Sequence, residues 1–556
     1  MNNTLENLDT IRLTPTTHEV TNQPPPLVDY NAWQADEILR KTVAREGGGW
    51  IADQAATLGE FVGSERMQVL AGQANRFVPE LHTHDRFGHR IDEVEYHPSY
   101  HELMSVAFTN GVHSLGWTAV GPGSFVARAA LYYLWNQGEN GTACPITMTF
   151  AGVQVLRQAA DLAREWEPKL LANVYDPRAL PVRDKRAATI GMAMTEKQGG
   201  SDLRANQTRA RHVGADLYEL RGHKWFCSAP MSDAFLTLAL VDGTITCFLV
   251  PRWLPAGGRN RFNIQRLKDK VGNRSNASAE VEYDGTLGTV VGEPGRGIAT
   301  LIEMAHLTRF DIVVAAAGMM RAALNQALHH CMHRVAFGRP LVDQPLMQNV
   351  LADLAMETEA ATLIAFRLAR AFDRMAESEH ERLITRIVTP IAKYWLCKRL
   401  PMLIAEAMEC LGGNGYIEEA PLARLHRESP LNGIWEGSGN VICLDVLRAI
   451  RKTPDARDAF FRELAPAIES NSRVSRYLDV IGTELGNAHD IEGRARRVTE
   501  QLAQLLSAAL LAQHAPQEVA DAFAVSRLGR DGGKAFGTLP GHIECSAIIE
   551  RARLKT

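Results

Sequence analysis

A carboxylate set between small and apolar residues is the group in this sequence best suited to chemistry. Glu436 lies in the segment Ile434-Trp435-Glu436-Gly437-Ser438-Gly439-Asn440. Most isolated glutamates are solvated surface residues. A carboxylate in a glycine-bounded apolar loop, however, can take a weakly acidic proton from carbon when the substrate is placed beside it. We therefore treat Glu436 as a candidate general base.

Three other segments combine glycine with polar or aromatic groups. They read Met192-Ala193-Met194-Thr195-Glu196-Lys197-Gln198-Gly199-Gly200-Ser201-Asp202, Gly222-His223-Lys224-Trp225-Phe226-Cys227-Ser228 and Leu411-Gly412-Gly413-Asn414-Gly415-Tyr416. Glycines let backbone N–H groups approach a flat polar ring or a phosphate, although ordinary turns have the same composition. The aromatic residues of the second segment suit either a core or the face of a ligand ring. No GxGxxG pattern follows a predicted strand, which argues against a Rossmann dinucleotide site.

The elements that must position these residues change character along the chain. Apolar residues at three- and four-residue spacing predict helices as far as Arg186, after a loop over residues 1–35. Short alternating segments then predict an all-β region, with strands at Tyr218–Leu220, Ala234–Val241, Thr244–Val250 and Ala279–Tyr283. Helical periodicity returns over about 298–335, 345–376, 380–412 and 440–452, lengths that suit a bundle. A further helical section follows Thr453-Pro454.

Composition excludes several classes of protein. The formal net charge of −4 gives no overall attraction to nucleic acid or to a membrane surface, so a polyanion site must be a local patch. The eight cysteines form no CxxC pair, and no histidine cluster has zinc-ligand spacing. We therefore expect no metal site and reduced thiols in a cytoplasmic protein. No apolar stretch is long enough for a membrane span, and no signal peptide is visible.

In order along the chain, these motifs resemble those of the acyl-CoA dehydrogenase superfamily. M-T-E-x-x-x-G-S-D, the G-x-K-x-W-I-T-N strand, K-x-G-x-R-x-S, R-x-x-F-G…Q, L-G-G-x-G-Y and Y-E-G-T/S all have counterparts. The finer resemblance is to AidB-like proteins, and it includes the segments Arg45–Trp50 and Cys144–Phe150. It covers nearly the whole chain and is weakest after about residue 455. One departure is Lys197, which replaces the proline that usually follows the glutamate.

This resemblance implies a multidomain α+β fold with FAD as its cofactor. The implied domains are an N-terminal helical domain (1–186), a middle β-domain (187–290), a C-terminal four-helix bundle (291–452) and an extra C-terminal helical extension (453–556). The residues that it places at the cofactor are Met194, Thr195, Gly200, Ser201, Phe226, Cys227, Ser228, Arg334, Phe337, Gln344, Gly412, Gly413, Trp435, Gly437, Ser438 and Asn440. Arg334 would reach the FAD of a neighbouring subunit, so a homotetramer is expected. For Leu267–Ser278 a solvated basic turn is the competing interpretation.

Two functions are compatible with the resemblance. The first is an AidB-like flavoprotein that binds double-stranded DNA without sequence preference in the response to alkylation damage. Its acyl-CoA dehydrogenase activity would be weak or vestigial, with Glu436 as the base. Arg448, Arg451 and Lys452 share one helix face and would contact DNA phosphates, unless they are a solvated surface paired with nearby acids. The second is an ordinary short- or branched-chain acyl-CoA dehydrogenase with an accessory tail.

Overall fold

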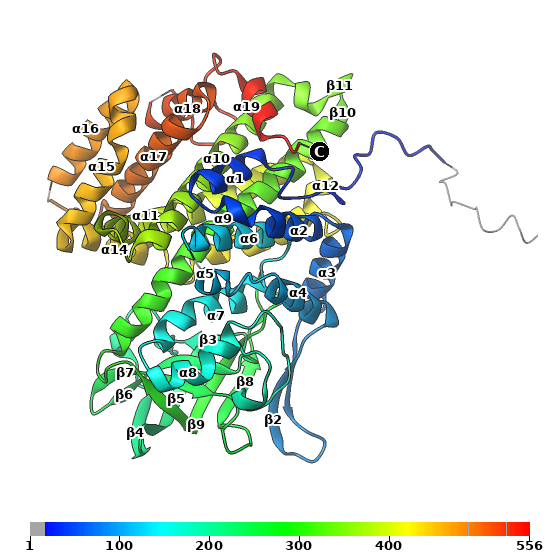
Figure 1. Ribbon diagram of the computed structural model, residues 1–556. Coiled ribbons are helices and arrows are strands. Elements are labelled where there is room, and N and C mark those ends of the chain that lie inside the picture. Colours follow the sequence, from blue (N-terminus) through cyan, green and yellow to red (C-terminus); the bar gives the residue numbers. More distant parts are fainter. Residues whose placement is uncertain (1–16, 120, 488, 530, 556) are drawn as a thin grey trace, which may run out of the picture.

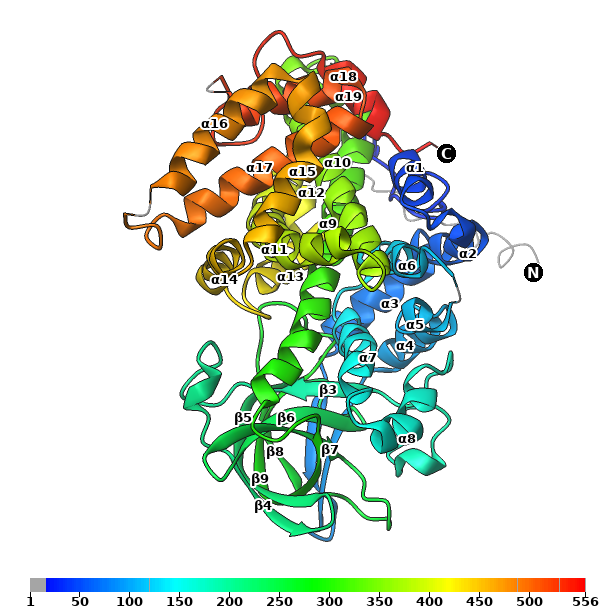
Figure 2. The ribbon, with the colours of Figure 1, turned by 60° about the vertical axis from the view of Figure 1, so that its left-hand side comes forward.

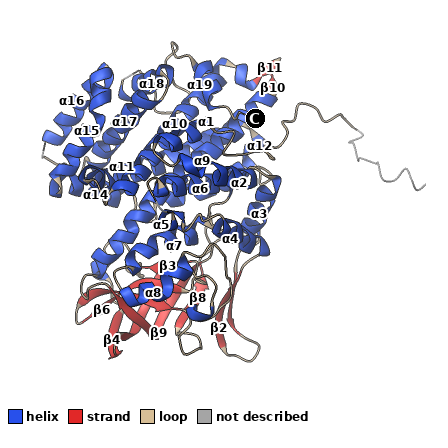
Figure 3. Ribbon diagram, viewed as in Figure 1, coloured by secondary structure: helices blue, strands red, loops and turns tan. Residues whose placement is uncertain are grey.

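Helices and strands occupy different parts of the molecule. The computed structural model describes residues 17–119, 121–487, 489–529 and 531–555. In Figure 1 the helices fill the upper part, and Figure 3 shows the main group of strands gathered at the lower end. Residues 1–16, at the start of the predicted N-terminal loop, lie outside the described residues. The predicted order of helices, β-domain, bundle and helical extension is confirmed.

The N-terminal region is helical but contains one hairpin. Its helices are α1 (Glu37–Arg45), α2 (Ala52–Val62), α3 (Glu65–Arg76), α4 (Pro98–Thr109), α5 (Leu115–Thr118), α6 (Ser124–Gly138), α7 (Ala143–Leu156) and α8 (Ala160–Leu170). Strands β1 (Glu80–His84) and β2 (Arg90–Glu95) pair antiparallel across a turn, an element that periodicity did not predict because both strands are rich in charge. The helical pattern of this region is interrupted between α7, which ends at Leu156, and α8, which begins at Ala160.

The β-domain is a sheet that closes on itself. Its strands are β3 (Ile190–Ala193), β4 (Arg209–Gly214), β5 (Leu217–Ser228), β6 (Ala234–Val241), β7 (Thr244–Pro251), β8 (Phe262–Leu267) and β9 (Ser278–Val291). The order is β3-β6-β4-β5-β9-β7, and closure follows because β7 pairs with both β6 and β9. Strands β5 and β9 extend well beyond the segments expected at Tyr218–Leu220 and Ala279–Tyr283.

Long buried helices form the bundle. They are α9 (Gly297–His333), α10 (Pro345–Arg374), α11 (Glu379–Cys410), α12 (Gly413–Tyr416), α13 (Pro421–Glu428) and α14 (Gly439–Lys452), with short strands β10 (Val335–Ala336) and β11 (Arg339–Pro340) after α9. The predicted boundaries of α9, α10, α11 and α14 lie within about two residues of those observed, because long helices repeat their apolar pattern many times. The short helices α12 and α13 were not predicted. Figure 2 shows α9 running down from the bundle onto the β-domain.

The extension packs against the bundle through buried ion pairs. Its helices are α15 (Pro454–Ser470), α16 (Ser472–Gly486), α17 (Ala495–His514), α18 (Gln517–Phe523) and α19 (Cys545–Ala552). Arg527 pairs with Asp353 and, at 2.8 Å, with Glu357, while Arg551 pairs with Glu359 at 2.7 Å. All three carboxylates belong to α10 and are at most 3% exposed. The extension supplies the cations for Asp353 and Glu359, and it shares Glu357 with Arg399 of α11, which lies 3.3 Å away. No helix in the described part of the chain is long and apolar enough to cross a membrane.

Candidate functional site

Two of the motifs meet in the β-domain through a buried ion pair. Lys224 donates to Oε1 of Glu196 at 2.9 Å, and both side chains are fully buried. The backbone N–H of Trp225 donates to the carbonyl of Thr195 at 2.8 Å. Burial alone would raise the pKa of Glu196, but Lys224 and the N–H of Gln207 outweigh it and lower that pKa to about 2. The loop after β3 is therefore held against β5 by charge as well as by the backbone.

A bulge in β5 lies at the point where Phe226 reaches the surface and Cys227 enters the core. The pairing with β9 shifts register between Lys224 and Cys227, and a bulge of this kind re-aims side chains. Phe226 is 51% exposed, whereas the next side chain, Cys227, is completely buried. An exposed phenylalanine on a strand agrees with the predicted contact to a flat ring. Cys227 cannot present its thiol to a ligand from inside the core, so the expected contact there is limited to its backbone.

The loop after β3 presents its hydroxyl groups at the surface beside β5. Thr195 and Met194 are half-buried, and Ser201 is exposed. A Cβ at Gly200 would lie 2.4 Å from the hydroxyl oxygen of Thr195, so this position requires glycine for the loop to fold over the threonine. Ser228, at the end of β5, is 3.4 Å from Ser278 between the hydroxyl oxygens. The predicted hydroxyl positions are thus brought to one end of β5.

Glu436 lies in a strained loop whose backbone carbonyls accept hydrogen bonds from two cationic side chains of the bundle. Its φ of +56° lies in the left-handed region, where a non-glycine residue is strained. Arg309 of α9 donates to the Glu436 carbonyl at 2.9 Å, and Lys393 of α11 donates to the Gly437 carbonyl at 2.6 Å. Sequence reasoning missed both cations, because neither belongs to a recognised motif. Trp435 donates from its indole to Asn432 at 3.0 Å, which fixes the ring beside the loop.

The Glu436 carboxyl group has an unsatisfied oxygen. Its Oε2 is buried and has no hydrogen-bond partner among the described residues. Burial raises the pKa of Glu436 and outweighs Arg309, Thr308 and Lys393, which lower it. A buried carboxylate without a partner is costly, so this oxygen is a group that a ligand is expected to meet. Glu436, Phe226 and the hydroxyls of the β3 loop therefore fit a cofactor with a flat ring and a substrate next to it.

A second set of predicted cofactor residues lies at the far end of the bundle. Arg334 caps α9, and it lies 25 residues beyond Arg309 (334 − 309), which is about 37 Å along a helix at 1.5 Å per residue. Figure 1 shows β10 and β11, and near them α12, on the opposite side of the bundle from α14. Phe337 is 98% exposed, and Gln344 donates to the Ala336 carbonyl at 2.9 Å.

This second set is solvent-accessible in one chain. Gly412 and Gly413 are exposed, with open space where a Cβ would stand. Arg334 donates to the carbonyl of Asn22 in the N-terminal segment. Arg309 contacts the Glu436 loop, so the distance of about 37 Å along α9 separates Arg334 from that loop within one chain. That Arg334 serves the FAD of a neighbouring chain remains a prediction.

The segment Leu267–Ser278 is largely buried from Gly272 onward, although Asp269 and Val271 are exposed, so a fully solvated turn does not describe it. Lys270 donates to the Asn276 carbonyl at 2.5 Å, and burial lowers its pKa to about 8. The N–H of Asn273 donates to Glu428 at 2.8 Å, and the Ser275 hydroxyl donates to Glu139 at 2.7 Å. The segment therefore ties the β-domain to α13 and to the end of α6.

The predicted basic face is exposed at the end of α14. Arg448, Arg451 and Lys452 all reach solvent. Arg448 lies 3.6 Å from Asp445, which also pairs with Arg309 at 3.0 Å, so part of its charge is balanced. Neither Arg451 nor Lys452 has an ion-pair partner within the ranges that the structure describes. The competing interpretation, a surface paired with acids, holds for Arg448 alone.

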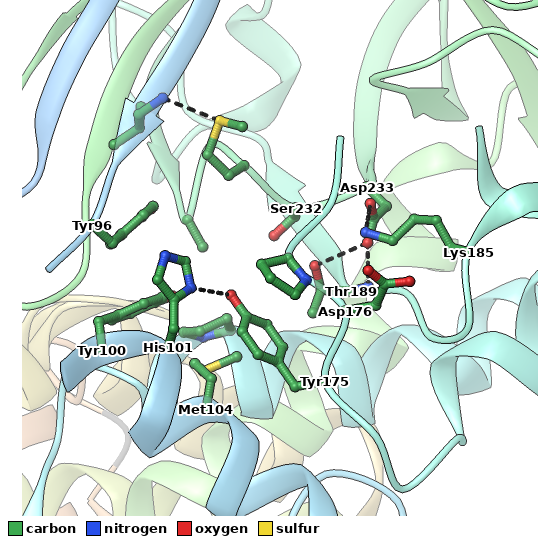
Figure 4. Close-up of a pocket in the computed structure, with 15 residues that line it drawn as sticks. Tyr96, Tyr100, His101, Met104, Tyr175, Asp176, Lys185, Thr189, Ser232 and Asp233 are labelled. Atoms are coloured by element: carbon green, nitrogen blue, oxygen red, sulfur yellow. Dashed lines mark hydrogen bonds and ion pairs between the residues drawn. The ribbon is translucent and has the colours of Figure 1, made fainter. Parts of the chain in front are cut away.

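A polar cavity borders the same end of β5 from the N-terminal side (Figure 4). Its lining includes Tyr100, His101, Tyr175, Lys185 and Asp233. His101 contacts the Tyr175 hydroxyl at 3.1 Å, and Lys185 donates to Asp233 at 2.5 Å with both side chains buried. Two further lining hydroxyls, those of Tyr96 and Ser232, are buried without a hydrogen-bond partner among the described residues. Glu436 is not among the lining residues, so this cavity is separate from the candidate base.

The fold and the site are those of an acyl-CoA dehydrogenase-like flavoprotein, and comparison with known proteins agrees. The chain matches the families Adaptive response protein AidB N-terminal domain (residues 22–177), Acyl-CoA dehydrogenase, middle domain (191–286), and Acyl-CoA dehydrogenase, C-terminal domain (295–451). The AidB protein of Escherichia coli (strain K12) is 44% identical over 521 residues, covering 93% of this chain and 95% of that protein. The chain belongs to the acyl-CoA dehydrogenase family, with the N-terminal domain of its AidB members.

Solved structures support the same conclusion. Caenorhabditis elegans ACDH-11 in complex with C11-CoA has a TM-score of 0.83 at 28% identity, with 93% of each chain covered. An acyl-CoA dehydrogenase of Bacillus anthracis complexed with FAD shares the fold, with a TM-score of 0.68 at 17% identity over 94% of this chain and 90% of that one. The predicted family is thereby confirmed.

Proposed function

We propose that this chain is an FAD-containing flavoprotein that uses Glu436 to take the α-proton of an acyl thioester. The observation that carries this proposal is the buried, unpartnered Oε2 of Glu436 in a loop held by Arg309 and Lys393. A base must keep an acceptor free for the proton, and most buried carboxylate oxygens in proteins do not. FAD, when bound, supplies the acceptor for the hydride that leaves the β-carbon.

The surrounding side chains suit this role for Glu436. Burial raises its pKa, and a carboxylate with a raised pKa is a stronger base once it is ionised. Arg309 and Lys393 hold the backbone of the loop rather than its carboxylate, so they fix the direction of the side chain without occupying it. The similarity to ACDH-11, solved with C11-CoA, supports an acyl-CoA as the substrate class.

Replacement of the base tests this proposal. Glu436→Gln should lower the rate at which an acyl-CoA bleaches the flavin absorbance anaerobically by about a hundredfold or more, because an amide cannot accept the proton. FAD content should remain that of the wild type. Glu419→Gln, at an exposed glutamate of the loop before α13, is the matched control and should leave the rate unchanged. An unchanged rate in Glu436→Gln would place the base elsewhere.

We also propose that the basic end of α14 contacts double-stranded DNA, and that the chain acts in a response to DNA alkylation. The observation that favours contact with DNA is that Arg451 and Lys452 are exposed and lack ion-pair partners among the described residues, on the helix that begins beside Glu436. Unpaired cations on a helix face can bind phosphates without reading bases. The similarity to AidB supports the alkylation response, and the alternative remains an acyl-CoA dehydrogenase with an accessory tail.

A salt titration separates the two alternatives. Duplex DNA binding should weaken linearly in the logarithm of salt concentration, and Arg451→Gln with Lys452→Gln should reduce the magnitude of that slope by about two. Arg211→Gln, on the distant strand β4, should leave the slope unchanged. Equal slopes for the wild type and the double variant would remove α14 as a DNA contact and favour the dehydrogenase with an accessory tail.

A further inference from the structure

Three arginines crowd the start of α17, a position that helix electrostatics disfavours. Arg494, Arg496 and Arg497 lie at the positively polarised end of this helix, and its first turn has no acidic residue. Arg494 and Arg497 both pair with Glu484, at 2.5 and 2.7 Å. Arg496 has no carboxylate partner within the described ranges. Its guanidinium Nε donates to Oδ1 of Asn440 at 2.7 Å.

That bond joins the extension to the loop that contains Glu436. Asn440 is the second residue of α14, and the resemblance places it at the cofactor. A Cβ at the preceding Gly439 would lie 3.1 Å from the Lys398 side chain and 3.5 Å from a guanidinium nitrogen of Arg496, so both cations close over the first turn of α14. The extension therefore reaches the same short loop as the bundle helices.

The three cations that hold this loop differ in what they bind. Arg309 and Lys393 bind backbone carbonyls, and both lie within the region that matches the acyl-CoA dehydrogenase C-terminal domain, residues 295–451. Arg496 lies beyond that region and binds a side chain. A dehydrogenase without the extension has no counterpart of this contact.

We propose that Arg496 is a positioning residue for the FAD site, which sets the orientation of the Asn440 amide from the C-terminal extension. The proposal rests on the proposed flavoprotein function and on the prediction that Asn440 lies at the FAD. An amide whose oxygen is engaged by a guanidinium presents its NH2 group in the opposite direction. Arg496 thereby makes Asn440 a donor toward the cofactor, and the extension becomes part of the flavin site without touching the flavin.

The test is a double-mutant cycle on FAD affinity. Arg496→Gln should weaken FAD binding two- to tenfold, the range expected for loss of one charge-assisted hydrogen bond at a partly exposed site. It should also shift the visible absorbance of the bound flavin. Asn440→Ala should weaken binding at least as much, and the combined variant should match Asn440→Ala, because Arg496 acts through that side chain. Arg497→Gln, one residue along α17 and paired with Glu484, should behave as wild type.

The outcomes separate this inference from the proposed function. This inference would be overturned if Arg496→Gln bound FAD as tightly as Arg497→Gln does. It would also be overturned if the effects of Arg496→Gln and Asn440→Ala on FAD affinity multiplied in the combined variant. Either result would leave the proposed flavoprotein function standing. A wild-type chain that binds no FAD would overturn the proposed function, and this inference with it. If Arg496→Gln unfolds, Arg496→Lys is used: it keeps the charge and one donor, and it should recover most of the wild-type affinity and spectrum.

Discussion

Removal of Lys224 should destabilise the β-domain severely, because it leaves a carboxylate buried without its cation. Lys224 and Glu196 are both fully buried and 2.9 Å apart. Breaking a buried pair by removing one partner costs about 3–5 kcal/mol. Glu196 keeps the N–H of Gln207, at 2.7 Å, as a hydrogen-bond donor. We therefore expect Lys224→Met to lower the free energy of unfolding by about 3 kcal/mol, the lower end of that range.

A double variant separates the destabilisation caused by the unpaired charge of Glu196 from that caused by the altered shape of the Lys224 side chain. In Glu196→Gln with Lys224→Met the buried charge is gone, so this variant should be more stable than Lys224→Met by at least about 1 kcal/mol. Lys197→Met, an exposed neighbour in the same loop, should change stability by less than about 0.5 kcal/mol. Urea unfolding at pH 7, followed by far-ultraviolet circular dichroism, measures all three variants.

The same variants report on the flavin site and on acid stability. The carbonyl of Thr195 and the N–H of Trp225 are joined next to the pair, so Lys224→Met should also weaken FAD binding. Because the pKa of Glu196 is lowered to about 2, its contribution to stability is present above about pH 4.5 and is lost as the pH falls toward 2. A loss below 1 kcal/mol in Lys224→Met, or a double variant less stable than Lys224→Met, would refute the reasoning.

Two further predictions concern Glu428 and Arg334. Burial, with Glu139 nearby, raises the pKa of Glu428 to about 7, so wild-type stability should fall as the pH rises from about 4.5 to 7. Between pH 4.5 and 7 the free energy of unfolding of Glu428→Gln, measured by thermal unfolding, should rise relative to that of the wild type by up to about 3 kcal/mol. The same difference in unfolding free energy between the two proteins at pH 5 and at pH 8 would contradict this prediction. Arg334→Ala should lower FAD retention on gel filtration about tenfold, because a charged contact to phosphate is lost. Arg339→Ala, at an exposed arginine nearby, is the control and should retain FAD like the wild type. Equal retention in both variants would show that Arg334 makes no cofactor contact.

Two kinds of feature could be predicted from the sequence: long elements that repeat an apolar pattern, and motifs whose residues are contiguous in the chain. Helices α9 to α11 were located because 30 residues or more repeat the helical period. Glu436 was identified because its loop is a contiguous motif. The hairpin β1–β2 was missed, because its charged strands show no apolar alternation, and strand β8 was missed although it pairs with β9.

Contacts between distant segments could not be predicted from one sequence. Arg309 lies 127 residues before Glu436, and Arg496 lies 56 residues after Asn440, so no local spacing joins either pair. The buried pairing of Lys224 with Glu196 could not be predicted either, since a lysine inside a strand is usually exposed. Tertiary packing decides which charges are buried together, and the period of a helix or a strand carries no information about it.

The arginines that join the extension to α10 bear on how this architecture arose. Asp353 and Glu359 are buried carboxylates whose cations, Arg527 and Arg551, come from beyond residue 500. An ancestor with the bundle alone could not have carried those acids at these sites without their counter-charges. The acids and the extension must therefore have been acquired together, or the acids afterwards. The C-terminal hundred residues are thus not a detachable module, and a shortened chain built for crystallography or engineering would need uncharged residues at both positions, whereas Glu357 would keep Arg399 of the bundle as its partner.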